Sequence, residues 1–435
     1  MEFNKSIFWH RRDLRIDDNA GLFKALSNSR EVIPVFIFDH TILSRLPKSD
    51  RRLVFIHQEI KKLKRKYSTL GSDLLVLHGD PIDIIPQLAE ANKASAVYTN
   101  RDYEPYAIGR DKAIHETFKA KGIDFIGTKD HVVFEKNEVL KADGLPYTVY
   151  TPYSRKWKEY FKDNYKSSYP SEKLTDKLIQ QPEKQNLIEL IEMGFESIIH
   201  EFPKNSIHQD TLISYNEKRD YPSQQGTSLI GVHLRFGTRS IRSIVNESLG
   251  KSETYLNELI WRDFYQMIIY HFPHSAENSF RKKYDLIEWE KDIESFDLWC
   301  QGKTGYPIVD AGMRELNATG FMHNRVRMIV ASFLTKHLLI DWRLGAAYFA
   351  EHLLDFELAS NTGGWQWAAG CGCDAAPYFR IFNPYTQQQK FDKNFNYITK
   401  WVPEFGTNQY PSPIVDHKYA RERALNRYKK GLDRL

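Results

Sequence analysis

The chain has 435 residues, a length that suits two domains better than one. Its hydrophobic content of 41% allows sizeable cores, and its net charge of +5 is only a weak indication of nucleic-acid binding, because many soluble enzymes are as basic. Three cysteines exclude a disulfide framework. The low cysteine count, together with the lack of a leader and of an apolar run of membrane-spanning length, predicts a cytoplasmic protein. We expect no metal site, since Cys371 and Cys373 supply only two close ligands.

Five short apolar stretches predict strands at 6–10, 32–38, 74–78, 96–99 and 124–127. Helical patterns separate them, among others at 52–67 and 106–121. Continuous apolar strands that alternate with helices indicate a parallel sheet covered on both faces. No G-x-G-x-x-G follows the first strand, so we do not expect a dinucleotide held in the usual Rossmann manner.

The composition changes after this sheet. Lys, Asp, Ser, Pro and Gln are frequent from about 156 to 210, with one short apolar helical run at 188–199. From residue 215 onward the pattern is helical. We therefore predict an α/β plus all-α protein, with a parallel-sheet domain at 1–130, a long linker at 131–210 and an all-helical domain at 211–435.

The helical part carries polar groups in unusual patterns. Tyr255, Glu258, Trp261 and Arg262 follow one another at helical spacing, and such a stripe suits a pocket wall with both aromatic surface and hydrogen bonds. Thr227–Ser228 stands before the run from Leu229 and is expected to cap a helix there or to place free N–H groups near an anion.

A second group lies further on, where Asn324, Arg327 and Met328 share one helical face ahead of a strongly apolar run. An arginine in a packed helix must be paired or must bind an anion, and Asp355 and Glu357 are the nearest candidates. A structural ion pair would explain the arginine alone. The recurrence of tryptophan in the same stretch favours a site.

These motifs resemble the photolyase/cryptochrome family, and most closely a class I cyclobutane pyrimidine dimer photolyase. The resemblance starts at Phe8-Trp9-His10-Arg11-Arg12-Asp13-Leu14-Arg15 and is densest in Glu-Leu-Ile-Trp-Arg, Met-His-Asn-Arg-Val-Arg-Met and Gly-Gly-Trp-Gln-Trp. It implies an antenna domain, a linker and a helical domain that holds FAD. It also implies light-dependent repair of double-stranded DNA that contains pyrimidine dimers, by a monomer with no membrane contact.

Carried over residue by residue, the resemblance assigns two sets of binding positions. Those expected to hold FAD are Tyr215, Thr227, Ser228, Leu229, Ile230, Gly231, Tyr255, Glu258, Arg262, Arg327, Asp355, Phe356, Glu357 and Asn361. Those expected to contact the flipped dimer or DNA are Trp261, Met328, Trp367, Arg325 and Arg380.

The resemblance also implies roles in the reaction. Glu258 and Asn324 are expected to hydrogen-bond the pyrimidine carbonyls, and Trp365, Trp342 and Trp289 to relay electrons to the flavin. A folate or a deazaflavin antenna is implied for the first domain, and the residues do not distinguish them.

Three positions depart from the family pattern. Gly231 stands in place of a serine, Tyr255 in place of a tryptophan, and Glu357 in place of an aspartate. A cryptochrome-type blue-light receptor is the main alternative, but the intact pocket residues favour repair. A (6-4) photolyase is disfavoured by Met322-His323-Asn324-Arg325, and an α/β nucleotide-binding transferase would leave the tryptophan-rich motifs unexplained.

Overall fold

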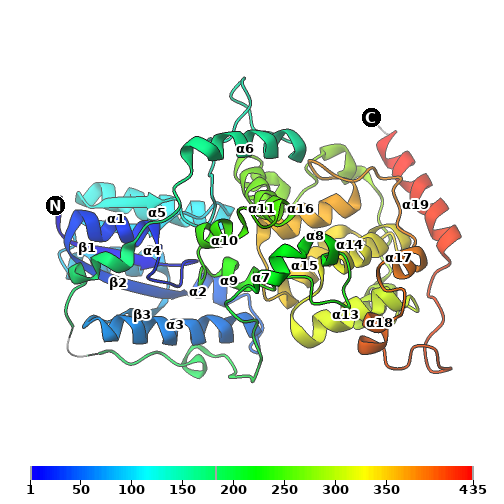
Figure 1. Cartoon of the computed structure of the whole chain (residues 1–435), viewed down its shortest axis with the longest axis horizontal. Helices are drawn as coiled ribbons and strands as arrows, with labels where there is room; N and C mark the ends of the chain where they lie inside the picture. Colours follow the sequence, from blue (N-terminus) through cyan, green and yellow to red (C-terminus); the bar gives the residue numbers. More distant parts are fainter. Residues whose placement is uncertain (1, 182–183, 434–435) are drawn as a thin grey trace. The chain divides into compact units, whose positions relative to one another are not determined.

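The computed structural model describes residues 2–181 and 184–433. Its contacts divide the chain into two compact units, coloured by sequence in Figure 1. The first contains Met1–Val139, Lys156–Ser206 and Leu229–Leu249, and the second contains Leu140–Arg155, Ile207–Ser228 and Gly250–Leu435. The domain boundaries at 130 and 210 remain a prediction.

A five-stranded parallel sheet forms the centre of the first unit, in the order β3-β2-β1-β4-β5. Its strands are β1 (Phe3–His10), β2 (Ser29–Asp39), β3 (Leu75–Gly79), β4 (Ala96–Asn100) and β5 (Asp124–Thr128). All five predicted strands are confirmed, because buried strands read as near-continuous apolar runs.

Helices cover both faces of this sheet. Side chains alternate along β1, so Phe8 packs with α1 (Ala20–Asn28) and α3 (Arg51–Thr69), whereas Ile7 and Trp9 pack with the helices of the opposite face. Those are α4 (Pro81–Ala91) and α5 (Pro105–Lys121). The predicted α/β class is thereby confirmed.

The apolar run at 188–199 is not a helix of that length. Only the 3-10 turn η2 (Leu190–Met193) forms there, and Gly194 ends it at φ 83°, a left-handed conformation that favours glycine. Leu190, Met193 and Phe195 still pack into the core of the first unit. The sequence pattern therefore gave the extent of the helix wrongly, and of its apolar residues Ile191 and Ile199 are exposed.

The regular elements among the described residues of the second unit are helical. Those that position the site are α8 (Tyr215–Lys218), α11 (Glu253–His271), α14 (Asn324–Ser332), the π-helical η5 (Phe333–His337), α15 (Trp342–His352) and α16 (Leu358–Ala369). Further along lie α12 (Ile293–Gln301), α13 (Pro307–Thr319), α17 (Pro384–Phe391), α18 (Asn396–Trp401) and α19 (His417–Leu432). Within the described ranges, no helix combines the length and the apolar character needed to cross a membrane.

Candidate functional site

A cavity of about 430 Å³ lies in the second unit, within the size range of ordinary small-molecule sites. Most of its wall comes from α11, α14, α16 and the segment between α15 and α16. Twelve residues predicted from the sequence line it: Glu258, Trp261, Arg262, Asn324, Arg327, Met328, Asp355, Phe356, Glu357, Asn361, Trp365 and Trp367. Helical spacing places the residues of each motif on one face of its helix, and the packing of these helices brings the faces to one cavity.

The arginines of the cavity are held by carboxylates. Arg327 pairs with Asp355 at 3.0 Å and donates from Nε to the carbonyl of Met322 at 2.7 Å. Arg262 pairs with Glu357 at 2.8 Å. The sequence left Asp355 and Glu357 open as partners of Arg327, and the structure pairs it with Asp355.

The face of α14 predicted from the sequence is confirmed, since Asn324, Arg327 and Met328 all line the cavity. His323 caps this helix, with Nδ1 accepting from the backbone N–H of Arg325 at 3.1 Å. Burial, assisted by the nearby Arg327, lowers the pKa of His323 to about 4. The neutral imidazole that can accept this hydrogen bond is therefore the stable form near pH 7.

Two glycines allow helices around the site to pack closely: Gly345 lies where α15 meets α16, and Gly363 lies where α16 meets α11. A side chain at Gly345 would collide with the indole of Trp365, and one at Gly363 would collide with the ring of Tyr265. Trp365 is buried and lies edge-on to Trp299, with 6.1 Å between ring centroids. Close packing at Gly345 fixes the Trp365 indole in the cavity wall, and close packing at Gly363 fixes the ring of Tyr265.

The other two predicted relay tryptophans lie outside the cavity wall. Trp342 is buried at the start of α15. Trp289 is half-buried and lies edge-on to Tyr428 at 5.9 Å. Exposure thus rises from Trp365 and Trp342 to Trp289, as a relay to the surface requires, but the role of the three stays a prediction.

The predicted phosphate-binding segment is placed differently from the expectation. Thr227–Ser228 does not cap a helix, because α9 (Gly231–Arg235) begins after Ile230 with no side-chain cap. The hydroxyl of Ser228 instead forms a hydrogen bond of 2.9 Å with that of Tyr255, the residue that replaces a tryptophan. Tyr215 lies edge-on to Tyr255 at 4.9 Å.

Leu229, Ile230 and Gly231 belong to the first unit. Leu229 has φ 53°, a strained conformation for a leucine that is typical of functional segments. Their role toward FAD remains a prediction.

The two arginines predicted to contact DNA are not in the cavity wall. Arg325 pairs with Asp220 at 2.7 Å, and Arg380 is exposed, with its guanidinium 5.8 Å from the ring centroid of Phe382. An exposed arginine fits a phosphate contact, whereas Arg325 would have to exchange Asp220 for one.

Sequence reasoning missed seven residues of the cavity wall, and the two of them with large polar side chains are Arg219 and Tyr265. Arg219 forms an ion pair with Glu258, 39 residues away. Tyr265 lies four positions after Trp261 on α11, so the helical stripe extended by one turn would have found it. No signal in the sequence singles out Arg219 among its neighbours.

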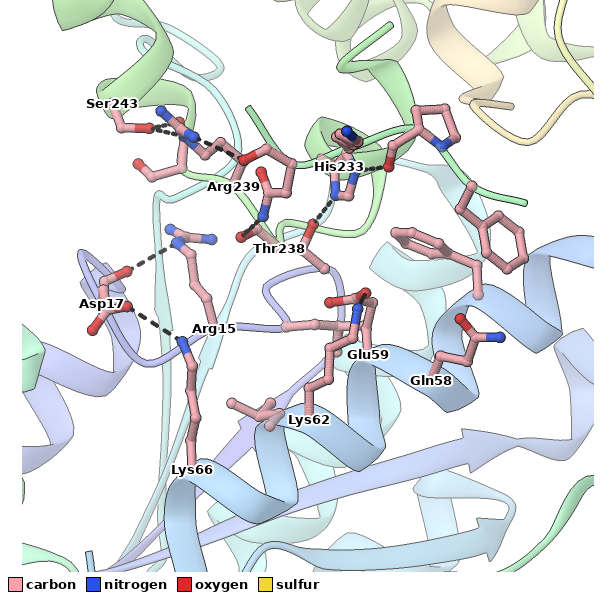
Figure 2. Close-up of a pocket in the computed structure, with 18 of the residues that line it drawn as sticks. Arg15, Asp17, Gln58, Glu59, Lys62, Lys66, His233, Thr238, Arg239 and Ser243 are labelled. Carbon is pink, nitrogen blue, oxygen red and sulfur yellow. Dashed lines mark hydrogen bonds and ion pairs between the residues drawn. The ribbon is translucent and has the colours of Figure 1, made fainter. Parts of the chain in front are cut away.

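A larger cavity of about 900 Å³ lies in the first unit, between α3 and the segments around Pro203 and Thr238. Figure 2 shows that charges of both signs alternate along it, with Lys66 paired to Asp17 and His233 bonded to Thr238. Lys62 pairs with Glu59 at 2.6 Å. Interleaved opposite charges offer no concentrated field for an ion, so size alone does not make this cavity the functional site.

Comparison with known families agrees with the fold and the cavity. Residues 6–173 match the DNA photolyase family model, and residues 255–409 match the model of the FAD-binding domain of DNA photolyase. A deoxyribodipyrimidine photo-lyase of Synechococcus is 37% identical, over 94% of this chain and 93% of its own. The chain belongs to the photolyase/cryptochrome family.

Solved structures point to two branches of that family. A class III photolyase from Agrobacterium tumefaciens superposes with a TM-score of 0.87 at 32% identity, covering 100% of this chain and 98% of the other. A Synechocystis cryptochrome superposes with a TM-score of 0.84 at 27% identity, covering 97% and 99%. The fold therefore does not separate repair from light reception, and the site residues must.

Proposed function

We propose that this protein is a light-dependent DNA repair enzyme that splits cyclobutane pyrimidine dimers with FAD. The observation that supports this most directly is the lining of the 430 Å³ cavity. The carboxylate of Glu258, the carboxamide of Asn324 and the indoles of Trp261 and Trp367 line the same cavity as the Arg327–Asp355 pair. Hydrogen-bonding groups between aromatic surfaces suit a base extruded from a duplex.

The residues of the cavity fit a flavin ring. Phe349 and Leu353 supply apolar surface, while the Arg327–Asp355 pair and the amide of Asn361 supply polar groups. Asn361 donates from Nδ2 to the carbonyl of Ala346 at 3.0 Å, and this bond fixes the plane of its amide. Arg327, Asp355, Phe356, Glu357 and Asn361 would hold the ring. When bound and fully reduced, FAD supplies one-electron transfer driven by light.

The chain's own residues would handle the substrate. Glu258 and Asn324 can orient the pyrimidine carbonyls: Asn324 can donate from its amide, and Glu258 can donate from its protonated carboxyl group, which would stabilise negative charge on the dimer. Trp261 and Trp367 offer flat walls, and Met328 offers an adaptable apolar floor. Arg219 holds the Glu258 carboxylate before substrate arrives.

An antenna chromophore in the first unit is part of the same proposal. A cavity of about 170 Å³ lies beyond the carboxyl ends of β1 and β2, where ligands of parallel sheets bind. Inside it, Arg110 stacks over Trp9 at 4.7 Å and pairs with Asp39 at 3.2 Å. This volume is below that of a drug-sized site, so a folate or a deazaflavin would have to displace Arg110. Glu104 lines the same cavity and pairs with Arg12 and Arg235.

A cryptochrome-type photoreceptor is the second candidate, favoured by the similarity to the Synechocystis cryptochrome. One experiment separates the two. Purified protein is reconstituted with FAD and illuminated with blue light together with a reductant and an oligonucleotide that carries a thymine dimer, while the ultraviolet absorbance of the bases and the flavin bands are followed.

Recovery of base absorbance in the light supports repair. Flavin bands that reduce in light without dimer loss would favour the photoreceptor. A folded protein that takes up no FAD would contradict both. An additional near-ultraviolet or violet band would reveal the antenna chromophore.

A further inference from the structure

The two faces of the Trp261 indole are unequal. Trp261 lines the 430 Å³ cavity, and its ring stacks on that of Tyr150 with 3.7 Å between centroids and 4° between planes. Tyr150 is not among the residues that line the cavity. One face of the indole is therefore covered by tyrosine, and only the opposite face is left for a ligand.

Tyr150 is itself anchored at both ends. Its hydroxyl donates to the carbonyl of Asn257 on α11 at 2.9 Å, one turn before Trp261 on the same helix. Its backbone N–H donates to the carboxylate of Asp374 at 3.1 Å. These bonds fix the tyrosine ring at the start of α6 (Tyr150–Asn164) against the indole.

Two other aromatic rings pack against the Trp261 indole. Phe264 lies edge-on to both Tyr150 and Trp261, at 5.9 and 5.6 Å, and Tyr265 is tilted against Trp261 at 5.4 Å. An indole packed against one parallel ring, one edge-on ring and one tilted ring has little freedom to rotate about its side-chain bonds.

We infer that Tyr150 is a positioning residue for substrate recognition: it holds the Trp261 indole flat from behind, so that the cavity-facing side is a preformed stacking platform for an extruded pyrimidine. This rests on the proposed function. The platform is made before the base arrives, so the base does not have to order the tryptophan on binding. Asp374 links this clamp to the segment that carries Arg380, the predicted phosphate contact.

The test measures dark binding of duplexes with and without one thymine dimer, by fluorescence anisotropy. Tyr150→Ala removes the backing ring, and we expect binding of dimer DNA to weaken about tenfold while binding of undamaged DNA and the FAD content stay unchanged. Tyr150→Phe keeps the stacked ring and should lose less than about threefold. Tyr150→Leu fills the space without a flat face and should resemble alanine, which covers the case that the alanine variant does not fold.

Tyr147→Phe is the matched control for Tyr150→Phe, because Tyr147 lies in the same segment and contacts Tyr153 at 6.1 Å rather than Trp261. The decisive readout is a double-mutant comparison. If Tyr150 acts through the indole, Tyr150→Ala has no further effect in a Trp261→Ala background. Near-ultraviolet circular dichroism of the FAD-free protein should also lose the tryptophan band of an immobilised Trp261 indole in Tyr150→Ala and keep it in Tyr150→Phe.

Three results would overturn the inference: dimer binding unchanged in both the alanine and leucine variants, equal weakening for dimer and undamaged DNA, or an undiminished effect of Tyr150→Ala without Trp261. Failure of the proposed function looks different. Wild-type protein would then show no preference for dimer DNA, and the role of Tyr150 in recognition would fall with it, whatever the dichroism band shows.

Discussion

The guanidinium of Arg219 forms an ion pair with the carboxylate of Glu258, and both side chains line the cavity of the second unit. Arg219 also lies 5.3 Å from the ring centroid of Tyr215, so it connects a predicted cofactor residue with a predicted substrate residue. Both partners are partly exposed, which makes the pair weaker than a buried one but free to rearrange. The pair therefore holds the Glu258 carboxylate at the wall of the cavity in the absence of substrate.

This arrangement predicts the behaviour of Glu258→Ala. The variant should retain FAD, because Arg327, Asp355 and Asn361 are intact, and should repair more slowly. Loss of one side-chain hydrogen bond to the substrate predicts roughly tenfold weaker dark binding of dimer DNA. The measurements are the FAD-to-protein ratio, anisotropy and dimer loss per absorbed photon. Glu258→Gln keeps a hydrogen-bonding side chain, so its rate of repair should lie between those of wild type and Glu258→Ala. An alanine variant that repairs like wild type would show that Glu258 has no part in the reaction.

The Arg327–Asp355 pair predicts a cofactor effect. Asp355→Ala leaves a guanidinium without its carboxylate in the cavity wall, and we expect FAD to dissociate about tenfold more readily. FAD retained after gel filtration measures this. Glu404→Ala is a matched control, because the Arg314–Glu404 pair of the same unit has nearly the same exposure and lies outside the cavity. Equal FAD loss in both variants would indicate general destabilisation instead.

The position of Trp365 in the cavity wall predicts a defect confined to photoreduction. Trp365→Phe should block light-driven reduction of the flavin and spare repair by flavin reduced beforehand, since phenylalanine is a much poorer one-electron donor and still fills the wall. Flash photolysis and repair of pre-reduced samples measure the two steps. Trp299→Phe is the control, because Trp299 contacts Trp365 but does not line the cavity. Loss of repair in pre-reduced Trp365→Phe would contradict the assigned role.

The buried cap of α14 predicts a pH dependence. The folded pKa of His323 is lowered to about 4 from an ordinary 6.5, so the unfolded chain binds the proton more tightly. Stability from this group is complete above pH 6.5 and is lost as pH falls from 6.5 to 4. The shift corresponds to roughly 3 kcal/mol in the free energy of unfolding.

Urea denaturation at pH 7 and pH 4.5 measures the effect. His323→Asn keeps a side-chain acceptor for the cap and has no titrating group, so it should be less sensitive to acid than wild type. Equal acid sensitivity in the two proteins would place the titration elsewhere.

The sequence by itself determined the sheet and the shared face of α14. Buried parallel strands leave continuous apolar runs, and residues three and four apart on a helix must lie side by side. The motifs around Trp261, Asn324 and Trp365 also identified the family, because several long motifs in one order leave little room for chance.

Tertiary structure decided the partners. Local spacing alone left both Asp355 and Glu357 open as partners of Arg327, the family resemblance implied Asp355, and the structure pairs Arg327 with Asp355 and Arg262 with Glu357. The ring of Tyr150 behind Trp261 and the guanidinium of Arg219 beside Glu258 arise from segments 111 and 39 residues apart. Such contacts leave no periodicity in the sequence, because packing and charge pairing depend on where whole helices come to rest and not on local spacing.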